Sequence, residues 1–169
     1  MRLRIDPRVA LEDRPDKLPM TLPEWGLSVA ALVIFLVTVA DFGLHYNALP
    51  DIIPTHYGLD GQPDGWGGRS ELLGMLAADT ACVLVIFVCN FFPQFYNIPF
   101  VARRRIMTEV LHATRLLCCW TNICVASIFC YLMHVTVNLS VISNAVMFGI
   151  LALMFVPMII YFVYLYRGR

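Results

Sequence analysis

The sequence has few charged residues. They make up 14% of the chain, against about 25% in an average soluble domain, whereas hydrophobic residues make up 59%. The 12 basic residues balance the 12 acidic ones, so the formal net charge of zero gives no overall field that would favour a nucleic-acid partner. A chain of 169 residues is too short to bury this much apolar surface in a core, which predicts a lipid bilayer as its surroundings.

Two further absences narrow the class of protein. The six cysteines all lie in apolar runs and no CxxC pair occurs, so neither a zinc site nor a redox pair is indicated. The GxSxG, HExxH and Walker motifs of common enzyme classes are also missing. We therefore expect no enzymatic activity and no cofactor, and we expect the cysteines to be free thiols packed between helices.

Apolar runs divide the chain into four spans. Residues 25–46 and 72–92 are each long enough, at about 1.5 Å per residue, to cross a hydrocarbon core about 30 Å thick. No Asp, Glu, Lys or Arg occurs from Leu116 to Tyr166, which is too long for one crossing, and the polar residues within 138–144 predict a turn there. The last two spans are therefore expected at 116–137 and 145–166, and the predicted fold is an all-α bundle of four transmembrane helices.

The polar segments complete this organisation. Residues 1–23 form a proline-spotted tail, and residues 24–169 form a single membrane domain with an outer loop at 47–71 and a second connection at 93–115. Of the 12 Lys and Arg residues, only Arg69 lies in the outer loop. Because positive residues favour the cytoplasmic side, both termini and the second connection, which holds Arg103, Arg104 and Arg105, are expected to be cytoplasmic. The outer loop is then extracytoplasmic.

The outer loop carries the most specific pattern in the chain. It contains an LP-x-x-IP-x-HY segment, a glycine-bearing turn, P-D-x-W and a basic residue, formed by Leu49, Pro50, Ile53, Pro54, His56, Tyr57, Gly61, Pro63, Asp64, Trp66 and Arg69. An N-x-P sequence follows the next span, at Asn97-Ile98-Pro99. Pro and Gly at this density predict a tightly turned, structured loop.

In these motifs the chain resembles a bacterial polytopic membrane family, a domain of unknown function found at the N-terminus of SdpI-like immunity proteins. The resemblance covers residues 25–110. It implies a small multi-pass protein of the bacterial cytoplasmic membrane. It also implies protection against a membrane-active peptide toxin, or the sensing of such a toxin.

The candidate ligand-binding or loop-structuring residues of the loop are His56, Asp60, Asp64, Trp66 and Arg69. We expect His56 and Asp64 to point toward the membrane surface and bond loop amides, with Trp66 packed at the interface. A second group of polar residues lies inside the spans, at Asp41, His45, Asp79, His134 and Asn138. A charged group in lipid costs about 2.5–3.5 kcal/mol, so these residues should face the bundle interior, either as packing contacts between helices or as an outward-facing polar pocket.

Two metal hypotheses remain open. The twelve residues Asp60–Glu71 approach the calcium-loop pattern, with Asp60, Asp64 and Glu71 as candidate ligands, although Gln62 and Gly67 depart from it. Alternatively, a transition metal could be held by His45, His56, Asp60 and His134.

Three function classes follow. The first is a protein that binds or senses an extracytoplasmic ligand, such as a peptide toxin, through its outer loop. The second is a small ion- or proton-coupled transporter or channel subunit that uses Asp79. The third is a structural or regulatory subunit whose partner is another membrane protein.

Overall fold

The computed structural model describes residues 18–98 and 107–167. Four long helices dominate the described part: α2 (Leu22–His45), α3 (Glu71–Cys89), α4 (Met107–Val137) and α5 (Asn144–Arg167). Each is long and apolar enough to cross a membrane. The prediction of a four-helix transmembrane bundle is therefore confirmed.

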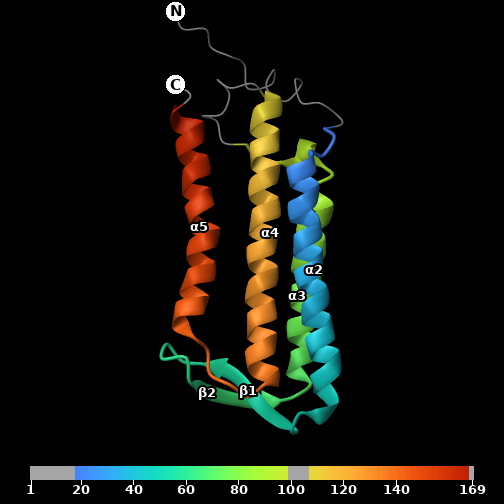
Figure 1. The fold of residues 1–169 in the computed structure, drawn as a ribbon, viewed down its shortest axis with the longest axis vertical. Coiled ribbons are helices and arrows are strands. Elements are labelled where there is room, and N and C mark those ends of the chain that lie inside the picture. The colour runs from blue at the N-terminus through green and yellow to red at the C-terminus, as the bar shows by residue number, and fades with distance from the viewer. Residues whose placement is uncertain (1–17, 99–106, 168–169) are drawn as a thin grey trace, which may run out of the picture.

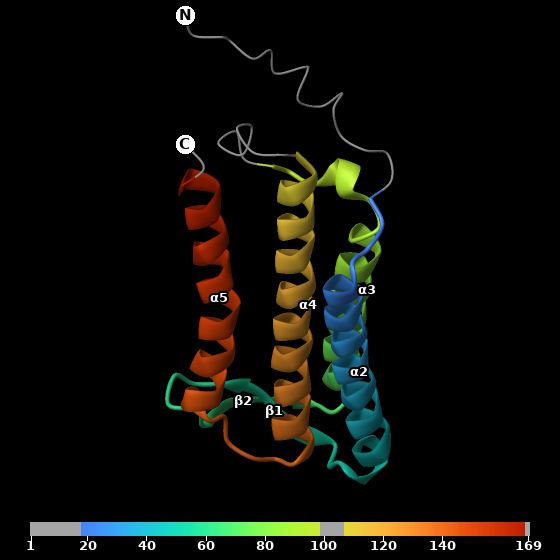
Figure 2. The ribbon, with the colours of Figure 1, turned by 45° about the horizontal axis from the view of Figure 1, so that its top comes forward.

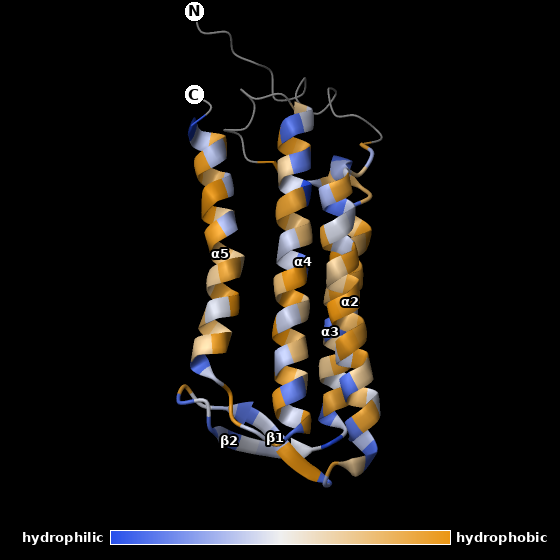
Figure 3. Cartoon of the chain, in the orientation of Figure 1, coloured by the Kyte–Doolittle hydropathy of each residue, from blue (hydrophilic) through white to orange (hydrophobic). Residues whose placement is uncertain are grey.

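The helices expose apolar side chains to their surroundings instead of burying them. In the most apolar 18-residue stretch of α5, no residue is buried inside the protein. In the corresponding stretches of α2 and α3, only 17% of the residues are buried. Apolar residues, coloured orange, extend along much of α2 and α5 (Figure 3). Such surfaces are stable when lipid tails, and not water, surround them.

Three of the helices form a compact group. α2 packs most extensively against α4, and α3 packs against both. α5 packs mainly against α4 and stands to one side of the group (Figures 1 and 2). α2 begins and α5 ends at the same end of the bundle, while the loop between α2 and α3 covers the opposite end (Figure 1). We call these the inner end and the outer end.

The outer loop contains a β-hairpin that the sequence analysis did not predict. After a short 3₁₀ turn, Tyr46–Ala48, strand β1 (Ile52–Tyr57) pairs antiparallel with β2 (Pro63–Gly68). The register shifts between Pro54 and Tyr57, so the hairpin is irregular there. Pro and Gly are rare in regular strands, which is why the composition of this segment indicated turns.

The hairpin shares a hydrophobic core with the helices. Ile53 is fully buried and packs in a cluster with Leu49 of the loop, Leu72 of α3, and Met133 and Val137 of α4. At about 25 cal/mol per Å², complete burial of one isoleucine side chain contributes roughly 1.5–3 kcal/mol. The hairpin is thus fixed to the bundle.

The helix bounds differ from the predicted spans mainly in α4. The described part of this helix starts at Met107, nine residues before the predicted start at 116, and so includes part of the predicted connection 93–115. The sequence analysis missed this first part of the helix because it contains the polar residues Glu109, His112 and Arg115. An apolar run marks the part of a helix that lies in lipid, and the helix itself can extend beyond it. A short 3₁₀ helix, Pro93–Phe95, follows α3.

Candidate functional site

The outer end of the bundle holds the turn of the hairpin in place through hydrogen bonds to the backbone carbonyls of the turn. The Ile142 N–H, in the connection between α4 and α5, donates to the Gly61 carbonyl at 2.9 Å, and Asn144 Nδ2 donates to the Leu59 carbonyl at 2.8 Å. Gly61 has a φ of +79°, and a Cβ built there would lie 2.1 Å from the Ile142 oxygen. Only glycine allows this close approach of the two backbones.

Arg69 anchors the other end of the hairpin. Its Nη1 donates to the Leu49 carbonyl at 3.2 Å, and its guanidinium lies 5.7 Å from the centre of the Tyr46 ring. The Asp51 carboxylate is 3.6 Å from Nη2. Arg69 therefore structures the loop, one of the two roles that the sequence analysis left open for it.

The exposed surface of the hairpin combines apolar side chains with carboxylates. Leu59 is 97% exposed, Ile52 66% and Trp66 62%. The segment 47–71 carries four carboxylates against a single guanidinium, that of Arg69. The outer loop, of which the hairpin is the main part, therefore presents an acidic surface with exposed apolar residues.

His56 and Asp64 differ from their predicted arrangement. His56 Nδ1 lies 2.5 Å from Asp64 Oδ1, so the two side chains pair across the hairpin instead of bonding loop amides. They are 74% and 52% exposed and are not buried against the bundle, and Trp66 is also largely exposed. The physical reason is the hairpin itself, because its strands already bond the loop amides to one another.

Four of the five predicted intramembrane polar residues do come together at the outer end. Asp41 Oδ1 lies 3.0 Å from His45 Nδ1, and Asp41 Oδ2 lies 3.2 Å from Nδ1 of His134. Asn138 Nδ2 lies 3.3 Å from the same His134 nitrogen. Helices α2 and α4 therefore share a polar cluster beneath the hairpin.

Asp79 is not part of this cluster. It lies one residue from the middle of α3 and is fully buried, as expected for a carboxylate in a membrane span. Neither carboxylate oxygen has a hydrogen-bond partner among the described residues. The interior position of Asp79 was predicted, but its isolation was not, and it does not join the pocket that the sequence analysis outlined.

The two metal hypotheses gain no support from the geometry. Across residues 18–98 and 107–167, no group of three or more His, Cys, Asp or Glu side chains is placed to hold a metal ion. Asp60 Oδ1 instead accepts from the Gln62 N–H at 3.1 Å, and Glu71 Oε1 accepts from the Gly68 N–H at 3.2 Å. The six cysteines are free thiols.

The inner end holds a buried charged cluster that the sequence analysis missed. Glu24 and Arg115 are fully buried, with Arg115 Nη1 3.3 Å from Glu24 Oε2, and His112 Nδ1 lies 2.8 Å from Glu24 Oε1. Arg115 also donates to the carbonyls of Leu18 and Pro19, at 3.0 and 3.2 Å. The clue in the sequence was a charged residue next to each apolar run, but sequence alone did not show that they pair.

The positively charged segments used to predict orientation are mostly outside the described residues. This holds for Arg2, Arg4, Arg8, Arg14 and Lys17, for Arg103, Arg104 and Arg105, and for Arg169. Pro99 of the N-x-P sequence is also outside them.

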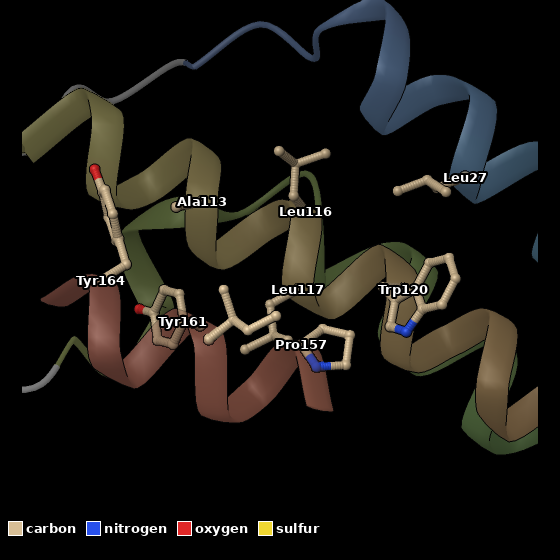
Figure 4. Close-up of a pocket in the computed structure, with 9 residues that line it drawn as sticks. Leu27, Ala113, Leu116, Leu117, Trp120, Pro157, Tyr161 and Tyr164 are labelled. Atoms are coloured by element: carbon tan, nitrogen blue, oxygen red, sulfur yellow. The ribbon is translucent and has the colours of Figure 1, made fainter. Parts of the chain in front are cut away.

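An apolar groove of about 490 Å³ lies between α4 and α5 (Figure 4). Trp120, Pro157 and Tyr161 line it, and Leu27 of α2 lies at its edge. Trp120 Nε1 donates to the Leu153 carbonyl at 2.7 Å across the groove. Its apolar lining fits the lipid-facing surface of a membrane bundle.

Comparison with known proteins gives two matches. Residues 32–78, which include the whole hairpin and end one residue before Asp79, match the model of the Domain of unknown function (DUF1648). An uncharacterized protein of Archaeoglobus fulgidus is 35% identical over 82 residues, which covers 41% of this chain and 45% of the relative. The chain thus spans less than half the length of that relative, and no solved structure matches. The chain is a multi-pass membrane protein that carries a DUF1648 domain.

Proposed function

We propose that this chain is a binding protein of the bacterial cytoplasmic membrane, not an enzyme, and that its hairpin captures cationic, amphipathic peptides outside the cell. In this proposal the outer end is extracytoplasmic and both termini are cytoplasmic. The proposal agrees with the resemblance of the loop motif to SdpI-like immunity proteins.

One observation carries the proposal: the hairpin is held rigidly, yet it exposes apolar side chains beside carboxylates. Ile53 and Gly61 fix it to the bundle, whereas Leu59 and Trp66 extend away from that core. A membrane-active peptide combines basic residues with an apolar face, and both would find partners here. A preformed surface also lowers the entropy cost of binding.

The position of the hairpin supports the same interpretation. It lies at the outer ends of the helices, where an amphipathic peptide accumulates before it enters the bilayer (Figure 1). Capture at this level would lower the amount of peptide that reaches the lipid.

The experiment uses a sensitive bacterial host that expresses the full chain and is challenged with a panel of cationic membrane-active peptides. We expect protection against at least one peptide. Purified protein should bind that peptide, and Trp66→Ala should weaken binding at least about tenfold, a loss of about 1.4 kcal/mol. Phe148→Ala, which truncates an equally exposed aromatic residue on α5, serves as the matched control and should bind like the wild type.

Absence of both protection and binding across the panel would refute the proposal, as would undiminished binding by Trp66→Ala. Orientation is tested separately with a reporter active only in the cytoplasm. It should be active after Arg169 and silent at Gly67.

A further inference from the structure

Buried polar side chains occur at intervals through the group of α2, α3 and α4, from its inner end to its outer end. Six of them are fully buried: Glu24, Ser28, Thr38, Asp79, Arg115 and Asn122. Fully buried polar groups are unusual in a membrane bundle, because lipid offers them no hydrogen bonds. We call this series, with its histidine–carboxylate pairs at the two ends, the polar seam.

Contacts between α2 and α4 fix the order of the seam. From the inner end outward, Glu24 pairs with His112 and Arg115, Ser28 Oγ lies 3.3 Å from Cys119 Sγ, and Asp41 pairs with His134. The distance along α4 from Arg115 to His134 is about 28 Å at 1.5 Å per residue, close to the thickness of a hydrocarbon core. The seam thus reaches from one side of the predicted membrane to the other.

α3 contributes the middle of the seam. Asn122 Nδ2 of α4 donates to the Val83 carbonyl of α3 at 3.2 Å, and Asp79 lies one helical turn from Val83 toward the outer end. The same step along the antiparallel α4 leads from Asn122 to Ala126, which is also buried. Thr38 of α2, also buried, lies three residues before Asp41.

The centre of the seam has hydrogen-bond acceptors without donors. Asp79 Oδ1, Asp79 Oδ2 and Asn122 Oδ1 are buried and have no hydrogen-bond partner among the described residues. A bound proton supplies the missing donor and removes the charge that burial disfavours. A salt bridge does not replace it, because no cationic side chain of the described segments pairs with Asp79.

Each end of the seam has a histidine next to a carboxylate. Histidine is the side chain that gains and loses protons near neutral pH, and His134 at the outer end and His112 at the inner end are both partly exposed. Arg115 and Glu24 are fully buried, so His112 is the inner group of that cluster that reaches the surroundings.

We propose that the polar seam is a transmembrane proton pathway in which Asp79 is the central proton-binding residue. A proton leaves the imidazolium of His134, converts the Asp79 carboxylate to a carboxylic acid, and passes on to His112. Only the proton moves, so no electron or co-reactant is needed, and water bridges the steps longer than a hydrogen bond. The titratable groups on α2 and α4, the helices packed against α3, are Glu24, Asp41, His45, Glu109, His112, Arg115, Cys118, Cys119, Cys124, Cys130, Tyr131 and His134.

The test measures proton flux into vesicles that contain the purified full chain and an internal pH-sensitive dye, with valinomycin and a potassium gradient setting the potential. Wild-type protein should acidify the vesicles several-fold faster than protein-free vesicles. Asp79→Asn should return the rate to that of protein-free vesicles. Asp51→Asn makes the same chemical change at an exposed loop position and should conduct like the wild type.

Wild-type flux no faster than that of protein-free vesicles would overturn the pathway, and so would undiminished flux through Asp79→Asn. If Asp79→Asn fails to fold, Asn122→Leu keeps the carboxyl group and should lower the flux. Undiminished flux through Asn122→Leu would then overturn the pathway. Peptide binding by the hairpin requires no part of the seam, so its result is independent of these outcomes.

Discussion

The two ends of the bundle use the same chemistry in different surroundings. At the outer end, His56 and Asp64 pair on an exposed hairpin, and Asp41 pairs with two histidines that are themselves partly exposed. At the inner end, Glu24 and Arg115 pair with no exposure at all. Water screens the exposed pairs of the outer end but not the buried pair of the inner end. Ion pairs with similar interatomic distances therefore contribute very different free energies to stability at the two ends.

The strongest test of this comparison is Arg115→Ala. It leaves Glu24 buried without its guanidinium and frees the carbonyls of Leu18 and Pro19, so we expect a loss of about 3–5 kcal/mol in the free energy of unfolding. Denaturant unfolding in detergent micelles, followed by circular dichroism, measures it. The double variant Glu24→Gln with Arg115→Met removes both charges and should recover most of the loss. An Arg115→Ala protein as stable as the wild type would contradict the argument.

The next largest effect is expected at the hairpin turn. Gly61→Ala places a methyl group against the Ile142 carbonyl at a positive φ, at a cost of about 1–3 kcal/mol. Hydrogen exchange of the β1 and β2 amides should accelerate, while the helices keep their protection. Gly149→Ala, at a position with open space, is the control and should leave exchange unchanged. Equal exchange in both variants would show that the turn is not what holds the hairpin.

A smaller effect is expected at the outer polar cluster. Asp41→Asn removes the carboxylate that contacts His45 and His134, but both histidines are partly exposed, so we expect a loss of about 1 kcal/mol or less. The same unfolding measurement, made beside Arg115→Ala, compares the two ends directly. A loss as large as that of Arg115→Ala would mean that the membrane shields the outer cluster from water.

The smallest effect is expected for Asp64→Ala. Its only described side-chain partner is the exposed His56, so stability should change by no more than about 0.5 kcal/mol. The sequence analysis instead expected Asp64 to bond loop amides, and in that arrangement the substitution would loosen the loop. Faster hydrogen exchange across the hairpin in Asp64→Ala would restore that earlier view.

The hairpin and the first part of α4 show why some features of the fold could not be predicted from the sequence. Strand pairing between Ile52 and Gly68 depends on contacts across the loop, and the glycines and prolines that permit its irregular register have low strand propensity. α4 extends through Glu109, His112 and Arg115 because Arg115 finds Glu24 on another helix. Both features join residues that are distant in the sequence, so neither can be recognised from the residue pattern of a single segment.

The sequence by itself determined that the chain crosses a membrane four times and that Asp41, His45, His134 and Asn138 lie near one end. Transfer of each apolar residue into lipid is a local quantity that adds along a helix, and residues four apart share a helix face. Only the tertiary structure decided that Glu24 meets Arg115, 91 residues away, and that Asp79 has no such partner within residues 18–98 and 107–167. Those outcomes depend on how each helix is rotated against its neighbours, which is set by the packing of all three helices together.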